Sequence, residues 1–279
     1  MNSVYRPWRT AALLILSLAV TASQARAKNP LAPLINAHAH NDYAHPRPLL
    51  DALDQGFCSV EADIYLVNGK LLVAHNREDV RPERTLEALY LEPLQQRVKG
   101  NGGRVYRGGP VFTLLVDIKG EAEPTYRVLL EVLAPYQGML TRYEGEKVLP
   151  GAVSIVLSGN RPRTVMEAQH SRLASLDGRL ADLGKGAAPA LISLVSDNWQ
   201  LSFKWRGIGV IPAEERTKLA ELVLRAHAEG YRLRFWATPD TVSAWAELRG
   251  AGVDLINTDN LSGLATYLRT PPDGTLLDQ

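Results

Sequence analysis

Residues 57–65 have the sequence Phe57-Cys58-Ser59-Val60-Glu61-Ala62-Asp63-Ile64-Tyr65, an apolar run that carries two acids at alternate positions. Successive side chains of a strand point to opposite faces, so Glu61 and Asp63 share one face. Two carboxylates on one face of a buried strand repel each other unless a cation lies between them. The stretch therefore predicts a buried strand that carries part of a metal site.

Short apolar runs of this kind alternate with longer segments of helical periodicity along the chain. This alternation is expected when parallel strands are connected by helices that cover them. Eight such runs predict a single α/β domain with the (β/α)8 or TIM-barrel fold, which commonly has about 250 residues. The predicted strands are 34–38, 57–65, 111–118, 153–157, 173–176, 191–195, 233–236 and 253–257.

Apolar residues at a spacing of three to four predict the helices between these strands. The clearest is 213–229, because Pro212 precedes it, acids lie in its first turn and Gly230 follows its end. Two glycine-rich stretches, 100–109 and 184–188, are predicted to be surface loops, since the alternation resumes after each. The other predicted helices are 48–55, 85–95, 123–133 and 241–249.

The composition is that of an ordinary globular protein, with 279 residues of which 46% are hydrophobic and 22% charged. It excludes a disordered or fibrous chain. The net charge of +1 predicts no attraction to nucleic acid by charge alone. Cys58 is the single cysteine, and its apolar neighbours predict a buried thiol that acts as a small hydrophobic residue.

The N-terminus has the pattern of a signal peptide. Arg6 and Arg9 precede an apolar run at 11–20, and the small residues of Ala25-Arg26-Ala27 follow. We therefore expect a signal peptide at 1–27, a barrel domain at 28–279 and export to the periplasm or the cell exterior. The apolar run is about half as long as a membrane span, so no stable span is expected after cleavage.

Polar residues cluster at the C-terminal ends of three consecutive predicted strands. His38-Ala39-His40-Asn41-Asp42 closes the first strand, Glu61 and Asp63 lie on the second, and Asp117 and Lys119 share a face of the third, while the segment 71–75 adds His75. In a barrel these strand ends form the catalytic face. Carboxylate oxygens suit Mg²⁺ or Ca²⁺ better than zinc, and histidines outside the metal shell suit general acid and base catalysis.

Taken in order, these motifs resemble those of the glycerophosphodiester phosphodiesterase and phosphatidylinositol phospholipase C-like superfamily. Within it, they are most similar to the branch of altered inheritance of mitochondria protein 6. The resemblance covers most of the predicted mature chain. It is carried by His40-Asn41-Asp42, Glu61-x-Asp63, His75, Asp117-x-Lys119, Trp236 and the segment 252–259.

The resemblance implies a metal-dependent phosphodiesterase that acts on a glycerophosphodiester or a phospholipid-like substrate. Glycerophosphodiesterases usually have His-Arg-Gly at positions 40–42 and glutamate at 117, and sphingomyelinase D-like enzymes are more similar at both points. The implied roles are acid/base catalysis by His40 and His75, binding of one divalent cation by Glu61, Asp63 and Asp117, and substrate contacts by Asn41, Lys119 and Trp236.

Two other classes of function remain open. His38-x-His40 also resembles the opening motif of metal-dependent amidohydrolases, but these need further histidines at later strand ends, and His170 and His227 lie in loop or helical context. The chain could instead be a noncatalytic binding barrel. The loss of a member of the His/Glu/Asp set would favour that class, and none is lost.

Two further positions allow a structural role. Trp236 ends an apolar strand and could pack in the core or line a pocket, and the resemblance favours the pocket. Residues 257–259 have the sequence Asn-Thr-Asp before an apolar run, which predicts the N-cap of the last helix.

Overall fold

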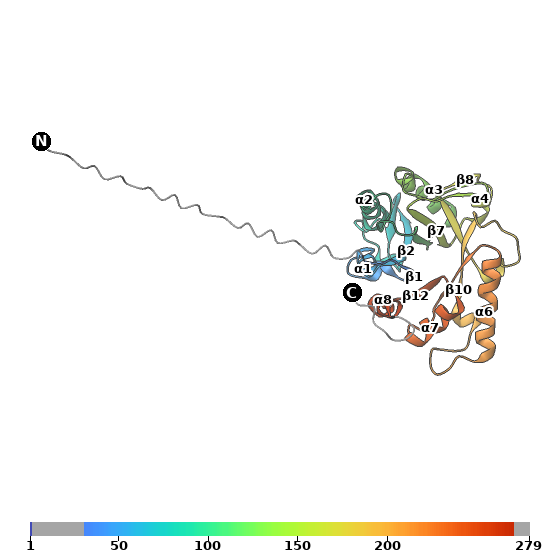
Figure 1. Ribbon diagram of the computed structural model, residues 1–279. Coiled ribbons are helices and arrows are strands. Elements are labelled where there is room, and N and C mark those ends of the chain that lie inside the picture. Colours follow the sequence, from blue (N-terminus) through green and yellow to red (C-terminus); the bar gives the residue numbers. More distant parts are fainter. Residues whose placement is uncertain (2–30, 271–279) are drawn as a thin grey trace.

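The computed structural model of the protein describes residue 1 and residues 31–270. Eight parallel strands close into a barrel, and helices surround it (Figure 1). The α/β-barrel prediction is confirmed, including the strand predicted at 173–176. Around the barrel the strands are β1 (Leu34–Ala39), β12 (Leu255–Thr258), β11 (Arg232–Trp236), β10 (Ile192–Asn198), β9 (Ala174–Gly178), β7 (Val153–Gly159), β4 (Phe112–Ile118) and β2 (Phe57–Val67), which pairs with β1.

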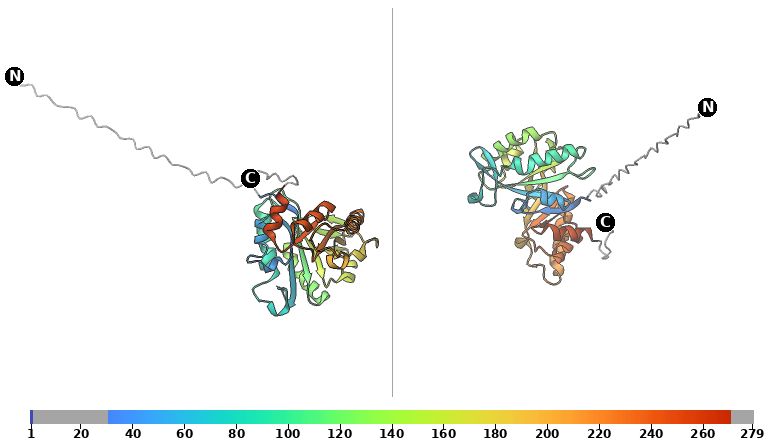
Figure 2. Two further views of the ribbon diagram at one scale, coloured as in Figure 1. Left: turned by 90° about the horizontal axis from the view of Figure 1, so that it is seen from below. Right: turned by 90° about the vertical axis from the view of Figure 1, so that its left-hand side faces the viewer.

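The helices predicted at 48–55, 123–133, 213–229 and 241–249 are confirmed within a few residues, and the one at 85–95 differs. There a π-helical turn, Glu87–Leu91, precedes α2 (Glu92–Gly100), and Pro93 at the junction lacks the N–H that a regular helix would use. Figure 2 shows the two halves of the chain forming opposite sides of the barrel. The other helices are α1 (Leu50–Asp54), α3 (Ala122–Leu133), α4 (Arg163–Glu167), α5 (Trp199–Ser202), α6 (Ala213–Ala228), α7 (Val242–Ala251) and α8 (Leu261–Arg269).

The structure contains two β-elements in addition to the eight barrel strands. Strand β3 (Lys70–Val73) pairs antiparallel with β2, which confirms the hairpin-like segment that leads to His75. A small second sheet, with the order β6-β5-β8, is formed by Lys147–Leu149, Arg142–Glu144 and Ser171–Arg172. Strands of two or three residues give too little alternation to be predicted from sequence.

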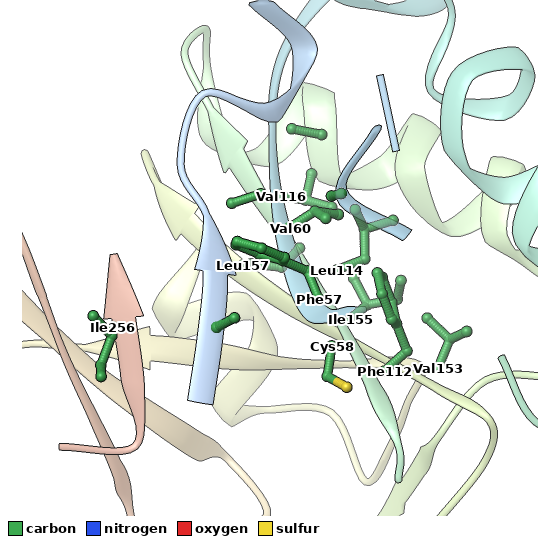
Figure 3. Packing of buried hydrophobic residues seen from close by; sticks show 14 of the residues in the cluster. Phe57, Cys58, Val60, Phe112, Leu114, Val116, Val153, Ile155, Leu157 and Ile256 are labelled. Atoms are coloured by element: carbon green, nitrogen blue, oxygen red, sulfur yellow. The ribbon is translucent and has the colours of Figure 1, made fainter. Parts of the chain in front are cut away.

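The two faces of the barrel strands differ in polarity. Outward-facing residues such as Val60, Leu114 and Ile155 join the large core between strands and helices (Figure 3), and Cys58 is buried there as predicted. Inside the barrel, by contrast, the buried apolar cluster within residues 31–270 consists of four aliphatic residues, Leu115, Val156, Leu194 and Leu255. The remaining inward positions toward the strand ends are free to carry polar groups.

The structure corrects the predicted cap of the last helix. The N-cap of α8 is Asn260, whose side-chain oxygen accepts a hydrogen bond from Gly263 N at 3.0 Å. Strand β12 continues through Thr258, so residues 257–258 belong to the barrel. The prediction was wrong because a strand end and a helix cap have similar polar sequences.

The ends of the predicted domain, 28–30 and 271–279, and the predicted signal peptide lie outside the described residues, apart from Met1. Within the described part, no helix is long and apolar enough to cross a membrane.

Asp42 holds the loop that follows β1. It is fully buried, and its Oδ2 accepts hydrogen bonds from Leu49 N and from the Tyr90 hydroxyl, the latter at 2.9 Å. Burial raises the pKa of Asp42 to about 7, although the two hydrogen bonds oppose the shift. The third residue of the His-Asn-Asp motif is therefore structural.

This raised pKa predicts a pH-dependent stability. Between pH 3.8 and about 7 the folded protein keeps a proton that the unfolded chain releases, so this contribution to stability is full at low pH and is lost as pH rises through 7. Asp42→Asn cannot ionise, so wild type should lose roughly 2–4 kcal/mol relative to it over this range in urea unfolding. The exposed Asp54→Asn is the control, and equal pH slopes for wild type and Asp42→Asn would contradict the assignment.

Candidate active site

Three carboxylates meet at the C-terminal ends of β2 and β4. Asp63 and Asp117 lie opposite each other in the parallel register, and Glu61 lies two residues before Asp63 on the same face. One ligand oxygen of each residue lies within 4.8 Å of the others. Glu61 and Asp63 are buried, with 6% and 1% of their surface exposed. The structure thus brings together all three predicted metal ligands.

The donor atoms of this carboxylate cluster fit a divalent cation. Asp63 Oδ1 is buried and has no hydrogen-bond partner among the described residues. Both contacts of Glu61 use Oε2, which leaves Oε1 without a partner in the same part of the chain. Free lone pairs on buried carboxylates are costly without a cation and are the ligands that Mg²⁺ and Ca²⁺ prefer.

The charges around the cluster also favour a cation. Burial, together with the charge of Glu61, raises the pKa of Asp63 to about 6, and burial raises the pKa of Asp117. Lys119 Nζ lies 3.1 Å from Asp63 Oδ2 and 3.2 Å from Asp117 Oδ1. Burial alone would lower the pKa of Lys119, and these two carboxylates overcome it and raise that pKa. Lys119 is therefore cationic and lies between two metal-ligand candidates.

Glu61 is held by an arginine that the sequence analysis missed. Arg234 on β11 is 2% exposed, donates to Glu61 Oε2 at 2.8 Å and donates to Asn257 Oδ1 at 2.9 Å. Burial would raise the pKa of Glu61, but the Arg234 guanidinium and His38 lower it below its ordinary range. A charged residue between the apolar residues Leu233 and Phe235 of a predicted strand was the available signal.

His38 belongs to the barrel interior and not to a histidine metal site. Its Nδ1 lies 2.7 Å from Ser59 Oγ, and its Nε2 lies 3.5 Å from Glu61 Oε2. Burial, followed by the charge of Arg234, lowers the pKa of His38 to about 3, so the ring is neutral. Among the described residues, the carboxylate cluster is the one grouping with metal-site geometry, and it contains no histidine. This disfavours the amidohydrolase interpretation.

His75 is oriented by a second residue that sequence reasoning missed, Tyr43. Its Nδ1 lies 2.9 Å from the Tyr43 hydroxyl and 3.3 Å from Asp63 Oδ2. The same hydroxyl lies 2.7 Å from Asp63 Oδ2 and 2.6 Å from Asn41 Oδ1, and its single proton can serve only one of these acceptors. A proton on His75 Nδ1 satisfies the hydroxyl oxygen, which leaves Nε2 available for proton transfer.

His40 is oriented in a similar way from the opposite edge. Its Nδ1 lies 2.9 Å from Asp259 Oδ1, and the Asn41 amide donates to the same oxygen at 3.3 Å. Asn41 adopts the left-handed conformation, with φ 48°, which asparagine tolerates better than most residues. Burial would raise the pKa of Asp259, but the hydrogen bond from His40 prevails and lowers it. Asp259 therefore positions a histidine, where the sequence suggested a helix cap.

Two arginines extend the positive side of the barrel mouth. Arg161 follows β7, and its one side-chain hydrogen bond within residues 31–270 goes to Gly159 O at 3.3 Å. Burial, followed by the charge of Arg179, lowers the pKa of Arg161. Arg179 follows β9 and donates to Asp177 Oδ2 at 3.1 Å. With Lys119, these cations occupy the ends of three neighbouring strands.

Trp236 ends β11 and is 37% exposed, so it is not a core residue. It lies on the same strand as Arg234 and two residues beyond it, which places both on one face of β11. This position agrees with the predicted pocket, and the contact with substrate stays a prediction.

Comparison with known proteins bears on this arrangement. The model of the AIM6-like phosphodiesterase domain matches residues 28–177, which include the carboxylate cluster and both histidines. The chain belongs to this family. A second match, to the glycerophosphoryl diester phosphodiesterase family, covers residues 232–262 with Arg234 and Trp236.

Relatives of this AIM6-like chain span most of its length. It is 31% identical over 270 residues to altered inheritance of mitochondria protein 6 of Eremothecium gossypii, covering 84% of this chain and 69% of the relative. The homologous protein of Arthroderma benhamiae is 26% identical over 267 residues, covering 84% and 83%.

Solved structures support the fold of this AIM6-like chain. A glycerophosphodiester phosphodiesterase from Agrobacterium tumefaciens matches with a TM-score of 0.51 and 13% identity, covering 84% of this chain and 99% of that one. One from Parabacteroides distasonis matches with a TM-score of 0.50 and 12% identity, covering 84% and 96%. At these identities the likeness shows a shared barrel.

The buried Arg234–Glu61 pair predicts a large loss of stability when one partner is removed. Arg234→Met leaves the Glu61 carboxylate buried without its cation and should lower the free energy of unfolding by about 3–5 kcal/mol in urea titrations. The exposed Arg225→Met on α6 is the matched control.

A double variant separates the pair from general damage to the barrel. If the loss comes from the unpaired charge, Arg234→Met combined with Glu61→Gln should be more stable than Arg234→Met alone. Equal or lower stability of the double variant would argue against this electrostatic account.

Proposed function

We propose that this protein is an exported, divalent-metal-dependent hydrolase of phosphodiesters, either glycerophosphodiesters or phospholipid-like molecules. The observation that carries the proposal is the carboxylate cluster with its free lone pairs, flanked by Lys119 and by two histidines that are each oriented through Nδ1. Membership of the AIM6-like phosphodiesterase family and the barrel shared with glycerophosphodiester phosphodiesterases support the reaction class.

The charge balance of the site favours a phosphodiester. Three carboxylates face two cations, Lys119 and Arg234, so the protein supplies one net negative charge. A bound Mg²⁺ or Ca²⁺, held by Glu61, Asp63 and Asp117, would reverse that sign and neutralise the single negative charge of a phosphodiester. Arg161 and Arg179 extend the same positive side of the mouth.

The two histidines supply the proton transfers in this proposal. Asp259 holds the His40 ring through Nδ1, and Tyr43 and Asp63 hold the His75 ring through Nδ1. One histidine takes the proton of the attacking hydroxyl group or water, and the other protonates the departing alkoxide. In this proposal Lys119 and Asn41 bind the phosphoryl oxygens, and Trp236 contacts the alcohol portion of the substrate.

Export is the second part of the proposal. It is supported by the two arginines, the apolar run at 11–20 and the small residues before Lys28. Expression of the full chain in a bacterium, followed by fractionation and N-terminal sequencing, should find a protein that begins near Lys28 outside the cytoplasm. A full-length cytoplasmic product would contradict it.

Metal-dependent turnover is the primary test. The purified protein should hydrolyse bis-p-nitrophenyl phosphate with Mg²⁺ or Ca²⁺ and lose this activity in EDTA. Asp63→Asn removes one ligand and should reduce kcat/KM roughly a hundredfold or more, whereas Glu131→Gln, an exposed acid on α3, should have no effect. Tight metal binding without turnover of any phosphodiester would indicate a noncatalytic barrel.

The paired histidines make a second prediction. His75→Ala and His40→Ala should each lower kcat by about 10²–10⁴-fold, because each removes a proton-transfer group. Asp259→Asn keeps the shape but weakens the orientation of His40, so a loss of about 10–100-fold in kcat with little change in KM is expected. His227→Ala, at an exposed position on α6, is the control. Unchanged turnover of His75→Ala would contradict the two-histidine scheme.

A further inference from the structure

Large apolar side chains are exposed beside the barrel mouth. Ile208 is 87% exposed, Val210 81%, Leu201 80% and Val242 59%. The first three lie on α5 and on the connection from α5 to α6, and Val242 begins α7. We call these four residues the apolar rim. Single exposed aliphatic residues are common, but a group beside a catalytic face indicates an interaction surface.

Part of the apolar rim lies on a connection that is anchored to the core. The connection that carries Ile208 and Val210 is anchored by Phe203, Trp205 and Ile211, whose side chains are buried. Trp205 Nε1 donates to Ile208 O at 3.0 Å, and Trp199 Nε1 donates to Trp205 O at 3.0 Å. Ile208 and Val210 thus lie between the buried residues Trp205 and Ile211, so their exposure accompanies a connection that is anchored at both ends.

Contacts of Gly207 place the connection that carries Ile208 and Val210 next to the segment that follows Trp236. Gly207 has φ 80°, and a Cβ there would lie 2.8 Å from Pro239 Cβ and 2.9 Å from Thr241 Oγ1. Ser243 Oγ, beside Val242, donates to Gly207 O at 2.7 Å. The connection that carries Ile208 and Val210 therefore lies against the segment 237–241, which directly follows Trp236.

Positive charge borders the apolar rim. Lys204 and Arg206 are exposed on the same connection, and Lys218 lies nearby with its Nζ 2.7 Å from Ser202 O. None of the three has a carboxylate within 4.0 Å among the residues that the structure describes. The acid Glu215 is occupied by the backbone N–H groups of Lys204 and Trp205, both at 3.0 Å.

We propose that the apolar rim inserts into the surface of a bilayer that contains anionic lipids. Such a surface has two layers. The exposed aliphatic side chains match its acyl chains, and the neighbouring lysine and arginine side chains match its negative headgroups. Docking in this way brings the barrel mouth and Trp236 to the headgroup region, where lipid phosphodiesters lie. The link to catalysis rests on the proposed phosphodiesterase function, whereas the docking does not.

A second copy of the chain fits this surface less well. A two-fold contact would place Lys204 and Arg206 of one copy near the same residues of the other. Four side chains also cover much less than the area of about 800 Å² per partner that a stable protein interface buries.

Vesicle sedimentation tests the proposal. The purified protein should bind vesicles of phosphatidylcholine and phosphatidylglycerol more tightly than vesicles of phosphatidylcholine alone, and high salt should weaken binding. Ile208→Ser combined with Val210→Ser should reduce the partition coefficient about tenfold or more, because two aliphatic side chains lose their burial. Leu224→Ser, at a 68% exposed position on α6, is the matched control and should bind like wild type.

Turnover of soluble bis-p-nitrophenyl phosphate separates this proposal from the proposed function. The double variant should hydrolyse it like wild type, because neither residue touches the site. Wild type that does not bind anionic vesicles, or a double variant that binds them equally well, would overturn the docking proposal. So would a dimer in light scattering that the double variant abolishes. Absence of turnover in wild type would instead overturn the phosphodiesterase proposal and leave the vesicle result standing.

Discussion

The Arg234 guanidinium and the Glu61 carboxylate meet inside the barrel, 173 residues apart in the chain and 2.8 Å apart in space. Arg234 comes from β11 and Glu61 from β2, so the pair spans the interior of the closed sheet. Both groups are almost fully removed from water, and such a pair is stable only when its geometry is good and its other hydrogen bonds are made. Arg234 meets this condition by donating also to Asn257. The position of the first metal-ligand candidate therefore depends on barrel closure.

The barrel can hold so many charges because its apolar packing lies elsewhere. The outward faces of the strands and the surrounding helices form the large core, and a small cluster of four aliphatic residues lies inside the described part of the barrel. Above that cluster the interior carries carboxylates, a neutral histidine and arginine in contact with one another. Successive side chains of a strand point to opposite faces, so one face of each strand packs in the apolar core and the other carries the polar groups of the site.

The mouth is also divided around its circumference. Carboxylates and Lys119 lie over β2 and β4, arginines follow β7 and β9, and Trp236 with the apolar rim lies beyond β10 and β11. A substrate with an anionic centre and an apolar portion fits this sequence of surfaces. His40 and His75 come from loops, but Asp259 and Tyr43 restrict each ring through Nδ1, which gives loop residues the fixed orientation that proton transfer needs.

The sequence by itself determined the fold class and the carboxylates of the site, because both depend on local periodicity. Alternation placed Glu61 and Asp63 on one face, the spacing of apolar runs predicted eight strands, and strand ends carried the histidines. Only the tertiary structure decided which residues hold these groups in place. The contacts of Arg234, Tyr43 and Asp259 join strands or loops that are brought together when the barrel closes. No local pattern encodes a contact between residues more than two hundred positions apart, such as His40 and Asp259. The apolar rim likewise needed the structure, because Ile208 and Ile211 are similar in sequence, and only packing decides that one is exposed and the other buried.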